Sequence, residues 1–99
     1  MNTSGFYELK PRFPLGRLVI TPGALEALTT NRQSLTQLLV RHGSGDWGDV
    51  SDDDRQQNDL SISTGLRLIS IYTMPDQTKL WVITESDRSA TTFLLPNEY

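Results

Sequence analysis

The run from His42 to Asp49 concentrates the side chains of this chain that could carry out chemistry. It reads His-Gly-Ser-Gly-Asp-Trp-Gly-Asp and contains the only histidine, one of the two tryptophans and three of the seven glycines. Histidine, a hydroxyl and carboxylates are the residue types of nucleophilic hydrolysis, but such sets are usually assembled from distant segments. The order Gly43-Ser44-Gly45 also lacks the glycine spacing of a nucleophile elbow. The pattern therefore favours a structural role for His42 at the end of a helix.

Metal and cofactor sites find little support in the composition. The chain has no cysteine and one histidine, which excludes the usual zinc sites. The carboxylates of Asp46, Asp49 and residues 52–54 do not follow the alternating ligands, central glycine and terminal glutamate of a calcium loop. We therefore expect no metal and no cofactor. The absence of cysteine also excludes disulfides and favours a reducing, cytoplasmic setting.

Acidic residues gather in one stretch of the chain. Six of the twelve lie between residues 46 and 59, where Arg55 is the single base, and the net charge of the chain is −3. Such a patch repels nucleic acid and attracts basic proteins. One interpretation is a partner-binding surface, formed by Asp46, Trp47, Asp49, Asp52, Asp53 and Asp54. The alternative is a helix start, because acids are favoured in the first turn of a helix and Asp54 could bond back to a cap at Ser51.

The two tryptophans have different settings in the sequence. Trp81 lies in the middle of a strand-like segment, which predicts a core position. Trp47 lies among glycines and charges, where it would either anchor the loop in the core or form an exposed interface anchor. The core anchor is the interpretation we favour for Trp47.

A second set of residues suggests a different function. It consists of His42, Arg17, Arg67, Lys79 and Arg88. Small toxin nucleases with helices packed on an antiparallel meander carry basic residues on such a sheet, although this analogy is one of fold alone. A single cleft holding all five side chains would support a nuclease, whereas scattered positions would remove that interpretation. The negative net charge argues against a nucleic-acid partner, and Arg88 could instead pair with Asp46 or Asp49.

The elements that must position these residues are short helices followed by strands. Residues 1–14 contain two prolines and no periodicity, which predicts an irregular arm before a single domain over residues 15–99. Helix-capping residue types predict three helices, beginning after Thr21, Ser34 and Ser51. The second helix is expected to end at Gly43 and the third at Gly65.

The last third of the chain alternates between apolar and polar residues. Segments 66–74, 80–85 and 90–95 are rich in β-branched and aromatic residues, and the short turns between them predict an antiparallel meander. With residues 15–20 as a fourth strand, we predict an α+β fold of three short helices packed on a mostly antiparallel sheet. An edge strand such as 15–20 or 90–95 could pair with a second copy, so the protein is expected to be a monomer or a homodimer.

No segment of the sequence predicts export or a membrane span. The first residues lack the basic and apolar regions of a signal peptide. No apolar run approaches the ~20 residues that cross a bilayer. We therefore expect a soluble, cytoplasmic protein without a membrane partner.

Three runs of residues resemble those of one protein family. They are Arg41–Asp49, with its HGSGDWGD loop, Lys79–Thr92 and Leu94–Tyr99. The family comprises small bacterial proteins described as hypothetical or plasmid-related, and the similarity extends from about residue 13 to the C-terminus. It implies a plasmid, phage or integrated-island setting, in which small acidic proteins often inhibit host defence enzymes.

Three functions are therefore open at this point. The first is a non-enzymatic module that binds a protein with a basic surface, such as a host defence or nucleic-acid-handling enzyme. The second is a small toxin-like nuclease that acts on RNA or DNA through a basic sheet face. The third is a purely structural accessory domain whose loop buries Trp47.

Overall fold

A computed structural model describes residues 10–99, so the expectations for residues 1–9 of the arm lie outside the described residues. The elements follow one another as β1 (Arg17–Ile20), α1 (Pro22–Thr30), α2 (Leu35–Gly43), α3 (Asp52–Thr64), β2 (Leu68–Thr73), β3 (Lys79–Thr84), β4 (Ala90–Leu94) and the short 3₁₀-helix η1 (Pro96–Glu98). This is the predicted α+β fold, with three helices and a four-stranded, mostly antiparallel sheet.

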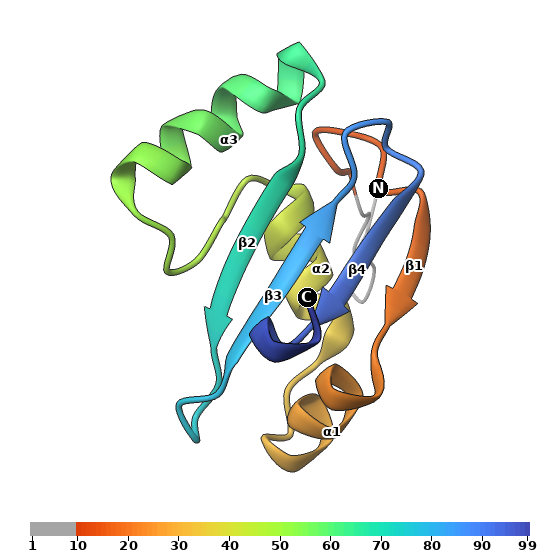
Figure 1. Cartoon of the computed structure of the whole chain (residues 1–99), viewed down its shortest axis with the longest axis vertical. Coiled ribbons are helices and arrows are strands. Elements are labelled where there is room, and N and C mark those ends of the chain that lie inside the picture. The colour runs from red at the N-terminus through yellow and green to blue at the C-terminus, as the bar shows by residue number, and fades with distance from the viewer. Residues whose placement is uncertain (1–9) are drawn as a thin grey trace, which may run out of the picture.

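The sheet has the strand order β1-β4-β3-β2. β2, β3 and β4 form the predicted antiparallel meander. β1 joins the far edge by pairing in parallel with β4, which is possible because three helices and two strands of the meander separate β1 from β4 in the chain. In Figure 1, α2 lies behind the sheet, while α3 stands apart beside β2.

Helix ends follow from local hydrogen bonds. The three predicted N-caps are confirmed, since each side chain accepts a hydrogen bond from the amide three residues ahead, at Thr21, Ser34 and Ser51. α3 ends as predicted at Gly65, which is left-handed with φ 78°. α2 runs through Gly43, and the left-handed glycine after it is Gly45. Gly43 is thus the last helical residue and not the predicted left-handed residue after the helix, so α2 ends slightly later than expected.

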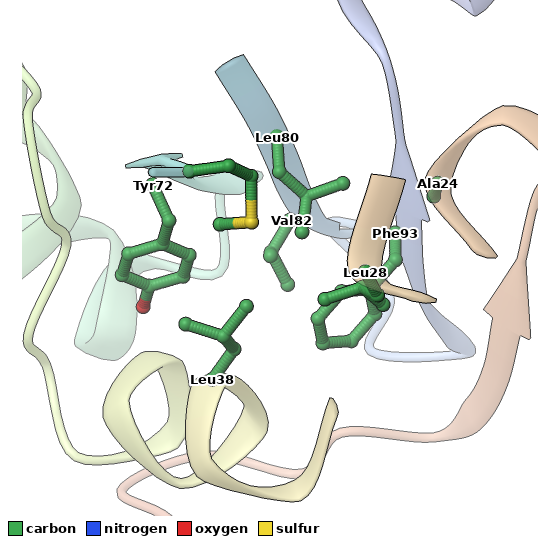
Figure 2. Packing of buried hydrophobic residues seen from close by; sticks show 8 residues of the cluster. Ala24, Leu28, Leu38, Tyr72, Leu80, Val82 and Phe93 are labelled. Atoms are coloured by element: carbon green, nitrogen blue, oxygen red, sulfur yellow. The ribbon is translucent and has the colours of Figure 1, made fainter. Parts of the chain in front are cut away.

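The main core lies between α1, α2 and the face of the sheet that we call the inner face. This face carries Leu68, Ser70, Tyr72, Leu80, Val82, Thr84, Thr91 and Phe93, all of which are buried. Figure 2 shows Leu28 of α1 and Leu38 of α2 pointing at the aromatic rings of Tyr72 and Phe93. Full burial of one such side chain contributes roughly 1.5–3 kcal/mol. The core therefore fixes α1 and α2, whereas α3 contributes nothing to it.

A second cluster holds the chain that precedes β1. Phe13 is buried against Trp47, Val50 and Leu68. The Arg12 amide also donates to the Gly43 carbonyl at 2.8 Å. Residues 10–14 form no helix or strand, but these contacts attach them to the domain.

The outer edge of β2 is closed by groups that do not belong to a strand. The Asp49 amide donates to the Ile71 carbonyl at 2.7 Å, and the Ile71 amide donates to the Trp47 carbonyl at 3.0 Å. Gly48 lies between them with φ 74°, where an added Cβ would come within 2.1 Å of the Ile71 oxygen. The Asn58 side chain completes the edge by donating to the Ile69 carbonyl at 2.8 Å and accepting from its amide at 3.2 Å.

The expectation that residues 90–95 form an edge strand is wrong. β4 lies between β1 and β3, because β1 pairs with it after crossing the helices. On its other side, β1 pairs with no strand within residues 10–99. Residues 17–20 are therefore the strand whose edge is open to a second copy.

η1 lies over the opposite, outer face of the sheet, in front of β3 and β4 in Figure 1. The Glu98 carboxylate accepts from the Thr21 hydroxyl at 2.6 Å and from the Gly23 amide at 3.0 Å, at the N-terminus of α1. A carboxylate is stabilised there by the helix dipole. This attachment brings the Tyr99 ring to 5.6 Å from that of Trp81.

Candidate functional site

Trp47 is a loop anchor inside the protein. Its side chain is 0% exposed, and its Nε1 donates to the Asp59 carboxylate at 2.9 Å. The ring stacks on Phe13 at 6.0 Å and meets the His42 ring edge-on at 5.6 Å. The favoured interpretation of Trp47 as a core anchor is confirmed. Its place in a partner-binding surface is wrong, because a partner has no access to it.

His42 belongs to a buried chain of hydrogen bonds. Its Nδ1 lies 2.6 Å from the Ser70 hydroxyl, and its Nε2 lies 2.8 Å from the Thr84 hydroxyl. Thr84 lies 2.7 Å from the Thr91 hydroxyl, which donates to the Leu15 carbonyl at 2.7 Å. One helix, all three meander strands and the segment before β1 are thereby connected.

The direction of this chain follows from its last acceptor. A carbonyl can only accept, so the one hydroxyl proton of Thr91 is given to Leu15, and Thr84 must donate to Thr91. Thr84 then accepts from His42 Nε2–H. Burial lowers the pKa of His42 to about 4, so the ring is neutral at neutral pH and its single proton is on Nε2. Nδ1 therefore accepts from the Ser70 hydroxyl.

These contacts leave His42 no role in hydrolysis. Ser70 is within hydrogen-bonding distance of the ring, but both side chains are 0% exposed, so no substrate can reach them. Ser44 donates instead to the Arg41 carbonyl at 2.9 Å and is exposed. The hydroxyl and the histidine of the HGSGDWGD loop therefore lie in different environments.

Asp46 supports the loop through Arg41. Its carboxylate accepts from Arg41 Nε at 2.7 Å and Nη2 at 3.3 Å, and this bond lowers the pKa of Asp46. The guanidinium lies 4.5 Å from the centre of the Tyr72 ring, and the Tyr72 hydroxyl donates to the Asp46 carbonyl at 2.6 Å. Much of the charge of Asp46 is therefore already balanced within the protein.

Asp49 is exposed and bonded to the end of the sheet. It accepts from the Thr73 hydroxyl at 2.6 Å, which lowers the pKa of Asp49. Thr73 in turn accepts from Lys79 Nζ at 2.7 Å. Lys79 is therefore engaged beside the acidic loop and does not point into a basic cleft.

The carboxylates of Asp52, Asp53 and Asp54 lie exposed on the first turn of α3. The Ser51 hydroxyl accepts from the Asp54 amide at 3.1 Å, but within residues 10–99 no bond returns from the Asp54 side chain to the cap. Asp52 approaches Arg55 at 4.0 Å, a distance at which an exposed pair contributes little. We use the name acidic surface for the five exposed residues Asp46, Asp49, Asp52, Asp53 and Asp54.

The basic residues predicted for a nuclease do not share a cleft. Arg17 begins β1 at one edge of the sheet, whereas Arg67 precedes β2 at the other edge. Lys79 lies at the opposite end of the strands from Arg67, and His42 is buried on the inner face. The predicted site is therefore not assembled.

Arg88 holds elements together and does not form an ion pair with the loop. Its Nη2 donates to the Ser61 carbonyl at 2.8 Å, and its Nη1 donates to the Leu66 carbonyl at 2.7 Å. The Ser61 carbonyl lies in the last turn of α3 and also accepts from the Gly65 amide, whereas Leu66 follows the helix, so one guanidinium joins the end of α3 to the segment before β2. The suggested pairing with Asp46 or Asp49 is wrong, because the guanidinium is committed to the end of α3.

A cleft of about 430 Å³ lies between α3 and the outer face of the sheet. It is lined by Val50, Asp54, Gln57, Asn58, Ser61, Leu66, Arg67, Ile69, Ile71 and Trp81. The expectation that Trp81 is a core residue is wrong, since its half-buried ring faces this cleft and Tyr99. The cleft was not predicted from the sequence, although side chains alternate along a strand and Ile69 and Ile71 therefore lie on the face opposite Leu68, Ser70 and Tyr72.

Comparison with protein-family models, with curated proteins and with solved structures finds no match to this chain. In the described part of the chain, no helix is long and apolar enough to cross a membrane. The same residues contain no group of three or more histidines and carboxylates arranged to hold a metal ion. The acidic surface and the cleft beside it are therefore the features of the molecule that bear on function.

Proposed function

We propose that this protein is a non-enzymatic binding module that recognises a protein partner with a basic surface through its acidic surface. The observation that carries the proposal is the position of Asp52, Asp53 and Asp54. They are exposed on the first turn of α3 and have no strong ion pair within residues 10–99. A row of exposed, weakly paired carboxylates favours an oppositely charged partner.

The rigid support of α3 strengthens this proposal. The Ser51 cap fixes the start of the helix, Asn58 attaches its middle to β2, and Arg88 holds its end. Side chains on a preorganised helix lose less freedom on binding than those on a loose one. The acidic surface therefore binds without a large ordering cost.

The resemblance described above suggests the kind of partner. In a mobile-element setting, a cytoplasmic host defence enzyme or nucleic-acid-handling enzyme with a basic groove would fit such a surface. Opposite fields speed association and make it sensitive to salt. The open edge of β1 lies on the far side of the sheet from α3, so a monomer and a β1-paired homodimer would both leave the acidic surface accessible.

Charge reversal tests the proposal directly. Tagged protein is incubated with a host lysate at low and high salt, and the retained proteins are identified by mass spectrometry. We expect one basic protein to be retained in a salt-sensitive manner. D52K/D53K should abolish its retention while the domain stays folded, with a loss of stability of about 1–2 kcal/mol from the two reversed charges at the helix N-terminus. Asp53→Lys and Glu26→Lys form a matched pair, since both acids are exposed on helices. Equal retention by these two variants, or full retention by D52K/D53K, would disprove the role of the acidic surface.

A further inference from the structure

The cleft beside α3 has an apolar floor and few polar groups that remain available. Ile69, Ile71 and Trp81 are half-buried on its floor. Asn58 has its amide bonded to the Ile69 backbone, and the Ser61 hydroxyl donates to the Gln57 carbonyl at 2.6 Å. A concave apolar surface with a small number of polar groups is the usual form of a specific binding site.

The charged groups of the cleft lie at its two ends. Asp54 is on the first turn of α3, about one helical turn before Asn58, whose side chain is bonded to Ile69 of β2. Arg67 lies at the other end, where its guanidinium donates to the Tyr99 hydroxyl and approaches the Tyr99 ring at 5.4 Å. Along a helix, the seven residues from Asp54 to Ser61 correspond to about 10 Å. A cation entering the cleft is therefore directed to the Asp54 end.

We infer that this cleft binds an arginine side chain of the partner, with its aliphatic stem on Ile71 and Trp81 and its guanidinium at Asp54. This inference rests on the proposed function and names the chemistry that the cleft recognises. A guanidinium pairs with a carboxylate through two parallel hydrogen bonds and stacks on an aromatic ring. Its stem covers apolar surface while the charged head stays at the rim.

Lysine matches the cleft less well than arginine. Its ammonium is a compact, strongly hydrated charge that neither stacks flat on an indole nor forms a two-pronged pair. Asp54 is also suited to the pair, because its side chain has no partner within residues 10–99. The cleft therefore adds selectivity for arginine to an acidic surface that would accept either base.

The two tryptophans provide an internal control for a binding experiment. An amide correlation NMR spectrum of the ¹⁵N-labelled chain contains two indole signals, one from Trp81 in the cleft and one from the buried Trp47. Trp81→Phe assigns them. The probes are the peptide acetyl-Leu-Arg-Leu-amide and two peptides of the same length in which lysine or citrulline replaces arginine. Citrulline keeps the shape of the arginine side chain without its charge.

We expect the arginine peptide to move the Trp81 indole signal in a saturable way and to leave the Trp47 signal in place. The citrulline peptide and Asp54→Asn should each weaken binding about tenfold, the effect of losing a charge-assisted bond. Asp53→Asn is the matched control, because Asp53 is the exposed neighbour of Asp54 and its carboxylate does not line the cleft. The inference is overturned by equal binding of the citrulline peptide, by equal losses in Asp53→Asn and Asp54→Asn, or by an unmoved Trp81 signal.

The partner retained from the lysate separates this inference from the proposed function. If D52K/D53K loses that partner while Asp54→Asn keeps it fully, the acidic surface binds and the assigned occupant of the cleft is wrong. If the arginine peptide binds at Trp81 while D52K/D53K keeps the partner, the cleft inference stands and the proposed function of the acidic surface is wrong.

Discussion

The inner and outer faces of this sheet come from the same strands and have opposite properties. On the inner face, helices cover the apolar side chains, and the polar ones are bonded in a single chain from Ser70 through His42 to Thr91. On the outer face, Ile71 and Trp81 stay half-buried beside a cleft. A fully bonded interior stabilises the domain, but its polar groups are already paired and are not accessible to a ligand. The binding that we propose therefore belongs to the outer side of the molecule.

The first way to test the comparison is to remove each tryptophan in turn. Trp47→Ala should lower the free energy of unfolding by about 4 kcal/mol, because it leaves a cavity among packed rings. Trp81→Ala should cost roughly 1–2 kcal/mol, since it enlarges an open cleft from which the indole was only partly desolvated. Urea unfolding of both variants gives the two values. Equal losses would contradict the division into a closed and an open face.

The second test uses pH, because the two faces differ in their titrating groups. Burial lowers the pKa of His42 from 6.5 to about 4, so the folded protein disfavours the protonated ring. Stability is therefore complete above pH 6.5 and falls as the pH drops toward 4, by roughly 3 kcal/mol for this group. The exposed carboxylates whose pKa values are lowered, including Asp46 and Asp49, contribute to stability while they are ionised. This contribution is lost only below their usual pKa of 3.8.

A His42→Gln variant isolates this effect. It removes the titrating ring, so its free energy of unfolding should change little between pH 6.5 and 4.5, although it starts from a lower value. Denaturant titrations of wild type and His42→Gln at several pH values provide the comparison. Parallel pH profiles for the two proteins would show that His42 is not the group responsible.

The smallest of the three effects compares neighbouring threonines on β4. Thr91→Val removes the acceptor of Thr84 and the donor to Leu15 inside the protein, which should cost about 1–2 kcal/mol. Thr92→Val is the matched control on the outer face, where its hydroxyl has no bond within the described residues, and it should stay within about 0.5 kcal/mol of wild type. Thermal unfolding of the pair measures the difference. A similar loss in both variants would argue against a bonded inner chain.

Local signals in the sequence were sufficient for much of the fold. Thr21, Ser34 and Ser51 fixed the helix starts because an N-cap depends on a few neighbouring residues. The β-branched and aromatic residues of segments 66–74, 80–85 and 90–95 located the three strands of the meander, because this preference acts within a few residues. These predictions needed no knowledge of distant segments.

The predictions that failed depended on contacts between distant segments. Alternation shows that β3 has two faces, but it does not show which face the helices cover, so Trp81 was assigned to the core. The positions of Phe13 and Arg88 depend on Trp47 and on the end of α3, which lie far from them in the sequence. Within the predicted site, the exposed acids were found from composition, whereas the cleft was not, because it exists only once α3 stands beside β2.

The parallel pairing of β1 with β4 has a consequence for the order of folding. The meander joins strands that are neighbours in the chain, so its contacts close short loops. Arg17 pairs with Ala90, from which it is separated by most of the chain. Closing such a long loop costs more conformational entropy before the contacts that stabilise it can form. We therefore expect β2, β3 and β4 to assemble early and β1 to dock late. The kinetic bottleneck of this small domain would then lie at the edge of the sheet farthest from α3.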